Sequence, residues 1–209
     1  MTKTTLTLTT VLMFGISQLL AQSALSQSQQ VFASAATYTP ATVNDSTAIP
    51  VSIAYTDTVI QWMSIEEAMA RQKLQPRKIF IEVYASWCGW CKKSESVFAN
   101  AEIAHYINQN YYPVKFNCET KTPVVFKGRS YPFINEGNFH VNEFALFLLN
   151  YKQSYPGFVF LNEEANVVGM RNGFIDEIML ENLANYYGSN AYREMPFNEF
   201  EDTFVGKVK

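Results

Sequence analysis

Apolar side chains are unevenly distributed along the 209 residues, and their pattern divides the chain into three parts. A mostly apolar run lies over residues 11–21, near the beginning. A segment rich in Ser, Gln, Thr and Ala follows and has no apolar period, which is typical of a flexible linker. From about Val59 onwards, apolar residues recur with the spacings of strands and helices. The predicted parts are a signal peptide over 1–26, a flexible linker over 27–58 and one folded domain over 59–209.

The first predicted element of the domain is a short helix. Ser64 is its expected N-cap, Glu67 is the capping-box partner three residues later, and Pro76 ends it. A continuous β-branched and aromatic run over 79–84 then indicates a central strand of a parallel sheet. The chain turns after this strand, and a long helical pattern begins at Lys92.

Helices and strands alternate through the rest of the chain. The remaining predicted elements are a helix over 92–110, a strand over 112–117, a hairpin over 123–134, a helix over 141–151, strands over 157–161 and 167–170, a helix over 175–187 and a short turn over 197–204. This order predicts an α/β fold in which a mixed sheet is flanked by helices in a single domain, with a β-hairpin inserted near 123–134.

The apolar run near the beginning has the features of an export signal. Lys3 supplies a positive start, and Ala24 and Ser26 place small residues where a signal peptidase cleaves. The alternative is a membrane anchor, but the run is short and interrupted by Ser, Gln and Thr. We therefore expect an exported protein, periplasmic or extracellular, with no stable membrane insertion after cleavage.

Composition and charge restrict the function classes. The hydrophobic fraction is 48% and the charged fraction 17%, which is enough apolar material for a packed core. The net charge is −3. Removing the leader takes away Lys3 and no acid, which leaves 15 basic and 19 acidic residues and a net charge of −4. The chain has no basic run, and this argues against a nucleic-acid partner.

Two of the three cysteines, Cys88 and Cys91, are separated by two residues. Such a pair can be a redox couple, half of a zinc site or a structural crosslink. Here the pair follows a buried strand and opens a helix, where the helix N-terminus lowers the pKa of the first thiol. Cys88 is thus the expected attacking thiol, and Cys91, one turn later, the resolving thiol. A zinc site needs about four ligands, and Cys118, His105 and His140 lie at no recognisable spacing, so we predict neither a metal nor a cofactor.

The segment from Trp87 through Cys88, Gly89, Trp90 and Cys91 to Lys92, placed after the strand over 79–84, resembles the active site of the thioredoxin superfamily. More narrowly, it resembles exported bacterial thioredoxin-like proteins with a Cys-Gly-Trp-Cys motif, and the similarity extends over about residues 60–204. The resemblance implies a thioredoxin-like fold and a thiol–disulfide oxidoreductase that acts on thiols or disulfides of exported proteins, together with an unidentified upstream redox partner.

Three further matches carry the resemblance. Glu82 lies six residues before Cys88, where the family has a buried acid that relays the proton of the resolving thiol; the alternative is an exposed carboxylate at a strand edge. Tyr155-Pro156 precedes the strand over 157–161, where the family has a cis-proline beside the disulfide; the alternative is an ordinary trans proline. Lys115 matches a lysine near the buried acid, or is a solvated strand-end residue.

The residues around the motif also depart from the family pattern. Thioredoxins have Gly-Pro between the cysteines and oxidising relatives have a histidine there, whereas this chain has Gly89-Trp90. Trp90 cannot stabilise a thiolate as a histidine does, so we expect a reducing or isomerising protein rather than a strongly oxidising one. The expected substrate-binding residues are Trp87, Gly89, Trp90, Tyr155 and Pro156, with an apolar rim around the disulfide.

Two readings of function remain open from the sequence. The first is the oxidoreductase, with Cys88, Cys91 and Glu82 as catalytic residues. The second is a non-enzymatic binding or assembly module of the same fold, in which the Cys88–Cys91 bond is structural. Cys118 is expected to be a buried small hydrophobe, with a third redox thiol or an interchain disulfide as the alternatives.

Overall fold

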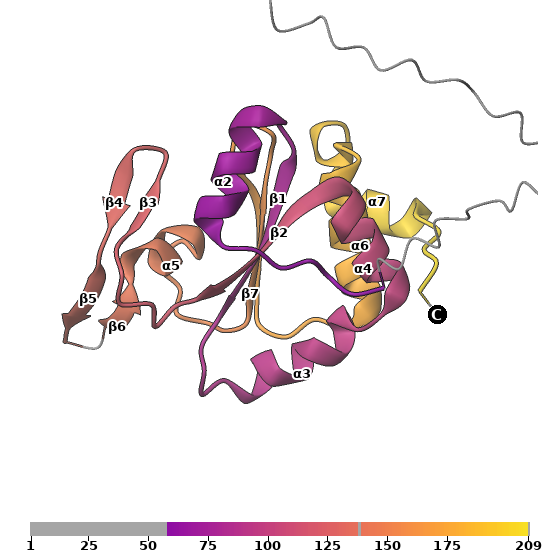
Figure 1. Ribbon diagram of the computed structural model, residues 1–209. Helices are drawn as coiled ribbons and strands as arrows, with labels where there is room; N and C mark the ends of the chain where they lie inside the picture. The colour runs from indigo at the N-terminus through magenta and orange to yellow at the C-terminus, as the bar shows by residue number, and fades with distance from the viewer. Residues whose placement is uncertain (1–57, 138, 209) are drawn as a thin grey trace, which may run out of the picture. The chain divides into compact units, whose positions relative to one another are not determined.

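The computed structural model describes residues 58–137 and 139–208 (Figure 1). The predicted signal peptide over 1–26 and all but the last residue of the predicted linker lie outside the described residues. Both therefore stay predictions. Within the described ranges, no helix combines the length and the apolar character that a membrane crossing requires.

A four-stranded mixed sheet forms the centre of the domain. Its strands lie in the order β2 (Tyr111–Asn117), β1 (Lys78–Tyr84), β7 (Gly157–Leu161) and β8 (Val167–Asn172). Strand β1 pairs with β2 in parallel and with β7 antiparallel, and β7 pairs antiparallel with β8. The predicted mixed sheet flanked by helices is thus confirmed. The continuous apolar run of β1 reflects its central position, where both faces are covered.

Successive residues of β1 point into two separate cores. Ile79, Ile81 and Val83 pack with helix α2 (Ile65–Leu74) and helix α5 (Glu143–Leu148) on one face. On the other face, Phe80 packs with side chains from α3 (Gly89–Phe98), α4 (Ala101–Asn110) and α6 (Glu177–Gly188). Figure 1 shows the same division, with α5 on one side of the strands and α4, α6 and α7 (Phe197–Thr203) on the other. Glu82 shares the parity of Phe80, so its side chain belongs to the α3 face.

Helix boundaries follow local capping. The predicted cap at Ser64 is confirmed, because its side chain accepts a hydrogen bond from the Glu67 N–H at 3.1 Å. The single helix predicted over 92–110 is wrong, since α3 ends at Phe98 and α4 begins at Ala101. The reason is Asn100, whose side chain accepts hydrogen bonds from the first N–H groups of α4 and so begins a new helix.

The insertion between β2 and β7 contains two hairpins, where the sequence predicted one. The predicted hairpin is confirmed as β3 (Val124–Phe126) and β4 (Arg129–Tyr131), joined at Lys127 and Gly128, which both have positive φ. Its second strand ends at Tyr131 instead of continuing to residue 134. A second hairpin follows, β5 (Phe133–Glu136) with β6 (Phe139–Asn142), and it takes up the first residues of the helix predicted over 141–151.

Asn142 connects this insertion to the sheet. Its side chain is fully buried and donates to the carbonyls of Thr120 and Thr122 at 3.0 and 3.1 Å. The same side chain caps α5 by accepting from the Phe144 N–H at 2.9 Å. Its own N–H donates to the Cys118 carbonyl at 2.7 Å, at the end of β2. One polar residue therefore fixes the start of α5 against the C-terminal end of β2.

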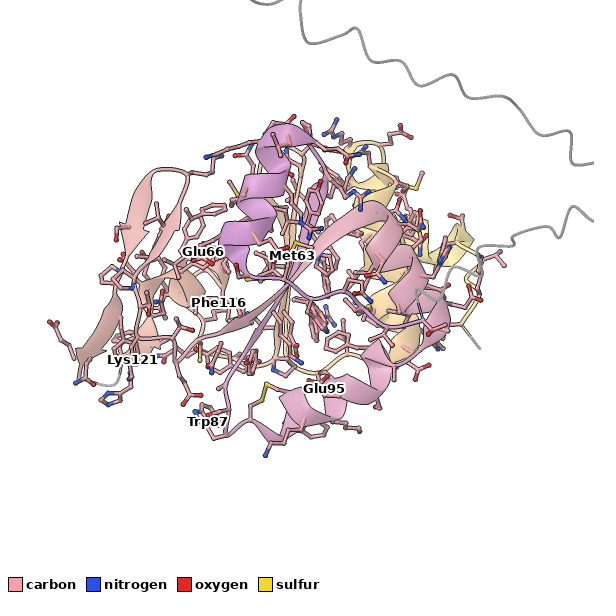
Figure 2. All side chains as sticks on the ribbon, in the orientation of Figure 1. Met63, Glu66, Trp87, Glu95, Phe116 and Lys121 are labelled. Carbon is pink, nitrogen blue, oxygen red and sulfur yellow. A yellow bond between two sulfur atoms is a disulfide. The ribbon has the colours of Figure 1, made fainter. Side chains whose placement is uncertain are left out.

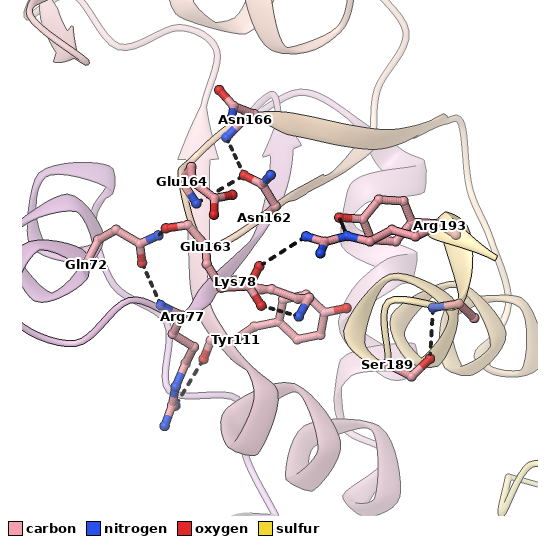
Figure 3. Close-up of polar contacts among 12 residues, drawn as sticks. Gln72, Arg77, Lys78, Tyr111, Asn162, Glu163, Glu164, Asn166, Ser189 and Arg193 are labelled. Carbon is pink, nitrogen blue, oxygen red and sulfur yellow. Dashed lines mark hydrogen bonds and ion pairs between the residues drawn. The ribbon is translucent and has the colours of Figure 1, made fainter.

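A polar network closes the opposite end of β1 (Figure 3). Lys78, at the start of β1, pairs with Glu163 in the β7–β8 turn at 2.5 Å. Gln72 of α2 donates to the Glu163 carbonyl and accepts from the Arg77 N–H. The buried Tyr111 hydroxyl donates to the Ala184 carbonyl of α6 at 2.6 Å. These groups satisfy one another between elements, so the network is structural and lies away from the cysteines.

Candidate functional site

The cysteine pair lies at the N-terminus of α3, as predicted. Cys88 is the N-cap of the helix, and its sulfur accepts a hydrogen bond from the Cys91 N–H at 3.0 Å. The two sulfurs form a disulfide with the Cα atoms 5.3 Å apart, and each residue is 4% exposed. The helix N-terminus and this N–H favour negative charge on Cys88 once the bond is reduced. The geometry thus suits Cys88 as the thiolate and Cys91 as its neighbour one turn inside.

The loop before Cys88 is held by a carboxylate that the sequence did not single out. Glu119 accepts hydrogen bonds from the Ser86 N–H at 2.6 Å and from the Ser86 hydroxyl at 2.5 Å. The hydrogen bonds from Ser86 lower the pKa of Glu119. The Cys88 N–H closes the same turn by donating to the Ala85 carbonyl at 3.1 Å. Glu119 lies two residues after the end of β2, and only the parallel pairing of β1 and β2 brings it to this loop.

Glu82 is buried beside the disulfide region, and the alternative of an exposed strand-edge residue is excluded. It is 0% exposed, and neither carboxylate oxygen has a hydrogen-bond partner among the described residues. Burial raises the pKa of Glu82 to about 7, although the nearby Lys115 acts in the opposite direction. A carboxyl group with this pKa exchanges its proton near neutral pH.

Lys115 lies between two carboxylates. Its Nζ is 3.5 Å from Glu82 Oε2, so the predicted pairing with Glu82 is confirmed as an ion pair. The same Nζ donates a hydrogen bond to Oε1 of Glu95, on α3. Figure 2 labels Glu95 on that helix and Trp87 in the loop before it. The sequence analysis did not identify Glu95, because 20 residues separate it from Lys115.

A cavity of about 370 Å³ joins these groups to the inner cysteine. Cys91 and Glu82 both line it, together with Lys115 and Glu95. Its remaining lining residues are Tyr84, Ala85, Ser86 and Lys92. Cys91 and Glu82 therefore border the same space.

Aromatic side chains border the disulfide on two sides. Trp87 and Trp90, which directly precede Cys88 and Cys91, are 70% and 57% exposed. Trp87 contacts Tyr155 edge-on at 6.1 Å between ring centroids, and Trp90 lies 5.5 Å from Phe174. The Tyr155-Pro156 peptide bond is cis, which confirms that prediction. Phe174 precedes α6 and had no signal in the sequence that linked it to the motif.

The third cysteine and the two histidines do not line the cavity that Glu82 and Cys91 share, although Cys118 packs in the same core as the cysteine pair. Cys118 is a free thiol, 3% exposed, and burial raises its pKa, which supports its interpretation as a core residue. His105 is exposed on α4. His140 belongs to β6 and contacts Asn135 at 2.5 Å. Over the described ranges, no three His, Cys, Asp or Glu side chains gather as a metal site would require.

Comparison with known proteins finds similarity over part of the chain. Residues 44–127, which include Glu82 and the cysteine pair, match the family model Thioredox_DsbH, described as a protein of unknown function, DUF255. An uncharacterized protein of Archaeoglobus fulgidus is 31% identical over 70 residues, covering 32% of this chain. The match covers 55% of that relative, so the chain spans about half of its length.

Solved structures with some similarity include three thioredoxin-like proteins. A thioredoxin-fold protein from Helicobacter pylori is 14% identical, with 70% of this chain and 86% of that one covered and a TM-score of 0.45. A thioredoxin from Thermus thermophilus is 16% identical, with 63% and 92% covered and a TM-score of 0.45. A DsbH oxidoreductase is 19% identical, with 67% and 87% covered and a TM-score of 0.38. The strand order β2, β1, β7 and β8 establishes the fold independently of these similarities.

Proposed function

We propose that the protein is a thiol–disulfide oxidoreductase that uses Cys88 and Cys91 as its redox pair. The observation that supports this most is the cavity shared by Cys91 and the buried Glu82, whose pKa lies near 7. A structural crosslink needs no proton acceptor, whereas a resolving thiol must lose its proton before it attacks. The capping position of Cys88 supports its role as the attacking thiolate.

The proposed reaction has two exchange steps, written for the reduced protein. The Cys88 thiolate attacks a substrate disulfide; a bond forms between Cys88 and one substrate sulfur, and the other substrate sulfur leaves as a thiolate. Cys91 then transfers its proton to Glu82 and attacks the Cys88 sulfur. The Cys88–Cys91 disulfide forms, the bond to the substrate breaks, and two electrons have passed to the substrate disulfide. A separate dithiol partner, not identified by the structure, reduces the pair again.

Protein substrates fit the surroundings of the disulfide. The exposed rings of Trp87 and Trp90 border the cysteine pair, and Tyr155-Pro156 lies beside Trp87. Apolar rings of this kind bind extended or partly unfolded chains. We propose reduction or isomerisation as the direction, because Trp90 stands where oxidising relatives carry a histidine. The leader-like pattern over 1–26 supports exported proteins as the substrates, in the periplasm or outside the cell.

Trapping the intermediate tests the mechanism. The Cys91→Ser variant should accumulate mixed disulfides with partner proteins through Cys88, because the resolving thiol is missing. Non-reducing gels and mass spectrometry of the adducts provide the measurement. The Cys88→Ser variant should trap nothing and lose reductase activity on a test disulfide. Cys118→Ser is the matched control and should behave like the original protein.

The alternative of a structural disulfide gives different results. If Cys88→Ser reduces the test disulfide at the original rate, the proposed mechanism is wrong. A redox titration provides an independent check. A pair that stays oxidised far below about −300 mV would be a structural crosslink in a binding or assembly module. Reversible titration in the range of known oxidoreductases would support the enzyme.

A further inference from the structure

The carboxylate of Glu95 competes with the buried Glu82 for the same cation. Lys115 donates its hydrogen bond to Glu95, whereas the Glu82 oxygen lies 3.5 Å away, beyond the length of a charge-assisted hydrogen bond. The Glu95 side chain is 55% exposed, and the Glu82 side chain 0%. Lys115 is thus bound by Glu95, the carboxylate that water can reach, whereas the buried Glu82 carboxylate has no hydrogen bond.

The position of Lys115 is also defined by three aromatic rings. Its Nζ lies 5.6 Å from the ring centroid of Trp62, 5.4 Å from that of Tyr84 and 5.8 Å from that of Phe98. Rings at this range attract an ammonium group without accepting a conventional hydrogen bond. They hold the ammonium group near both carboxylates, and hydrogen bonding determines which carboxylate it binds.

Resting on the proposed function, we infer that Glu95 is a positioning residue. It holds the Lys115 ammonium by a hydrogen bond, so that the buried Glu82 carboxyl group is left without one. Without Glu95, Lys115 has free donors and only a short distance to move towards Glu82. A hydrogen-bonded Glu82–Lys115 pair would hold the carboxylate ionised at lower pH and make it a weaker base.

The groups that face Glu82 come from three elements. Tyr84 lies on its own strand, and Lys115 reaches it from β2. Helix α3 contributes Cys91, the exposed Lys92 and Glu95 to the same cavity. The negative charge of Glu95 also raises the pKa of Glu82, after the larger effect of burial and against the effect of Lys115. Glu95 therefore acts on Glu82 both directly and by holding its counterion.

The test compares the pH dependence of Glu95→Gln with that of the original protein. We expect the half-maximal pH for resolving a preformed mixed disulfide to fall by about half a unit, since exposed ion pairs contribute a fraction of the energy of one pH unit. At pH 6 this makes resolution about two- to threefold faster, because more Glu82 is ionised. Above pH 8 Glu82 is ionised in both proteins, and the weaker base makes resolution no faster and up to about twofold slower. Stopped-flow release of a fluorescent thiol from Cys88 measures the rate.

Two variants separate this role from a general effect of charge or folding. Glu102→Gln removes an exposed carboxylate from α4 and should leave the pH profile unchanged. In a Lys115→Met background, adding Glu95→Gln should shift the profile less, because no cation remains to be redistributed. A profile that does not move in Glu95→Gln, or moves equally in both backgrounds, contradicts the inference.

Carboxyl-carbon NMR of Glu82 keeps the two proposals distinguishable. The oxidised protein is titrated with and without Glu95→Gln, which requires no enzymatic activity. If Glu95→Gln lowers the titration midpoint of Glu82 but the protein traps no substrate, the positioning role is supported and the oxidoreductase is refuted. Normal trapping through Cys88 with an unchanged midpoint would refute the positioning role alone.

Discussion

Glu82 should make the stability of the protein depend on pH in a way that one substitution removes. Burial raises the pKa of Glu82 from 4.5 to about 7 in the folded protein. The folded protein therefore retains a proton between these pH values that the unfolded chain has lost. By linkage, the free energy of unfolding falls as the pH rises through this window and levels off above it.

The magnitude follows from the two pKa values. A difference of about 2.5 pH units, at about 1.4 kcal/mol for each, gives a cost of roughly 3 kcal/mol for ionised Glu82 at pH 8. No discount for solvent screening is needed, because the side chain is 0% exposed. Glu82→Gln has nearly the same shape and no charge, so it should remove this cost at pH 8 and have little effect near pH 4.5.

Urea unfolding of the oxidised protein at a series of pH values from 4.5 to 8 measures this difference. The difference in unfolding free energy between Glu82→Gln and the original protein should grow by about 3 kcal/mol across the series. Glu164→Gln, at an exposed position in the β7–β8 turn, is the matched control and should give a constant difference. A constant difference for Glu82→Gln would refute the burial argument, whatever its absolute value.

Two further predictions concern the insertion and the aromatic rim. Asn142→Ala removes two hydrogen bonds from a buried side chain to backbone carbonyls and also removes the cap of α5. Urea unfolding should therefore show a loss of about 2–4 kcal/mol, and a loss below about 1 kcal/mol would contradict the anchoring role. Trp87→Ala should slow reduction of a protein disulfide by about 3- to 10-fold, which corresponds to the binding energy of one aromatic contact. It should leave reduction of a small aromatic disulfide unchanged. Equal slowing of both substrates would mean that Trp87 supports the loop and not the substrate.

Local patterns in the sequence were sufficient for several elements. The continuous run of β1 predicted a central strand because apolar side chains on both faces require cover on both faces. Ser64 predicted the start of α2 because capping involves neighbours three residues apart. The break at Asn100 used the same chemistry but was missed, because the apolar period continues across it from α3 into α4.

The second hairpin was missed for a different reason. Strands β5 and β6 are short, half of their positions are exposed, and their burial does not alternate along the chain. Their pairing is fixed by contacts around Asn142, which reaches back to carbonyls about 20 residues earlier. Such distant hydrogen bonds leave no periodic pattern in the chain.

For the candidate site, the sequence by itself determined the chemistry of each part, and the tertiary structure decided how the parts act together. The order strand, Cys-Gly-Trp-Cys, helix was enough to place Cys88 at a helix N-terminus, because capping is local. The sequence could not determine whether Glu82 is buried, since that depends on α3 covering one face of β1. Nor could it show that Glu95 binds Lys115, because electrostatic interactions depend on distance in space, and only packing α3 beside β2 creates that distance.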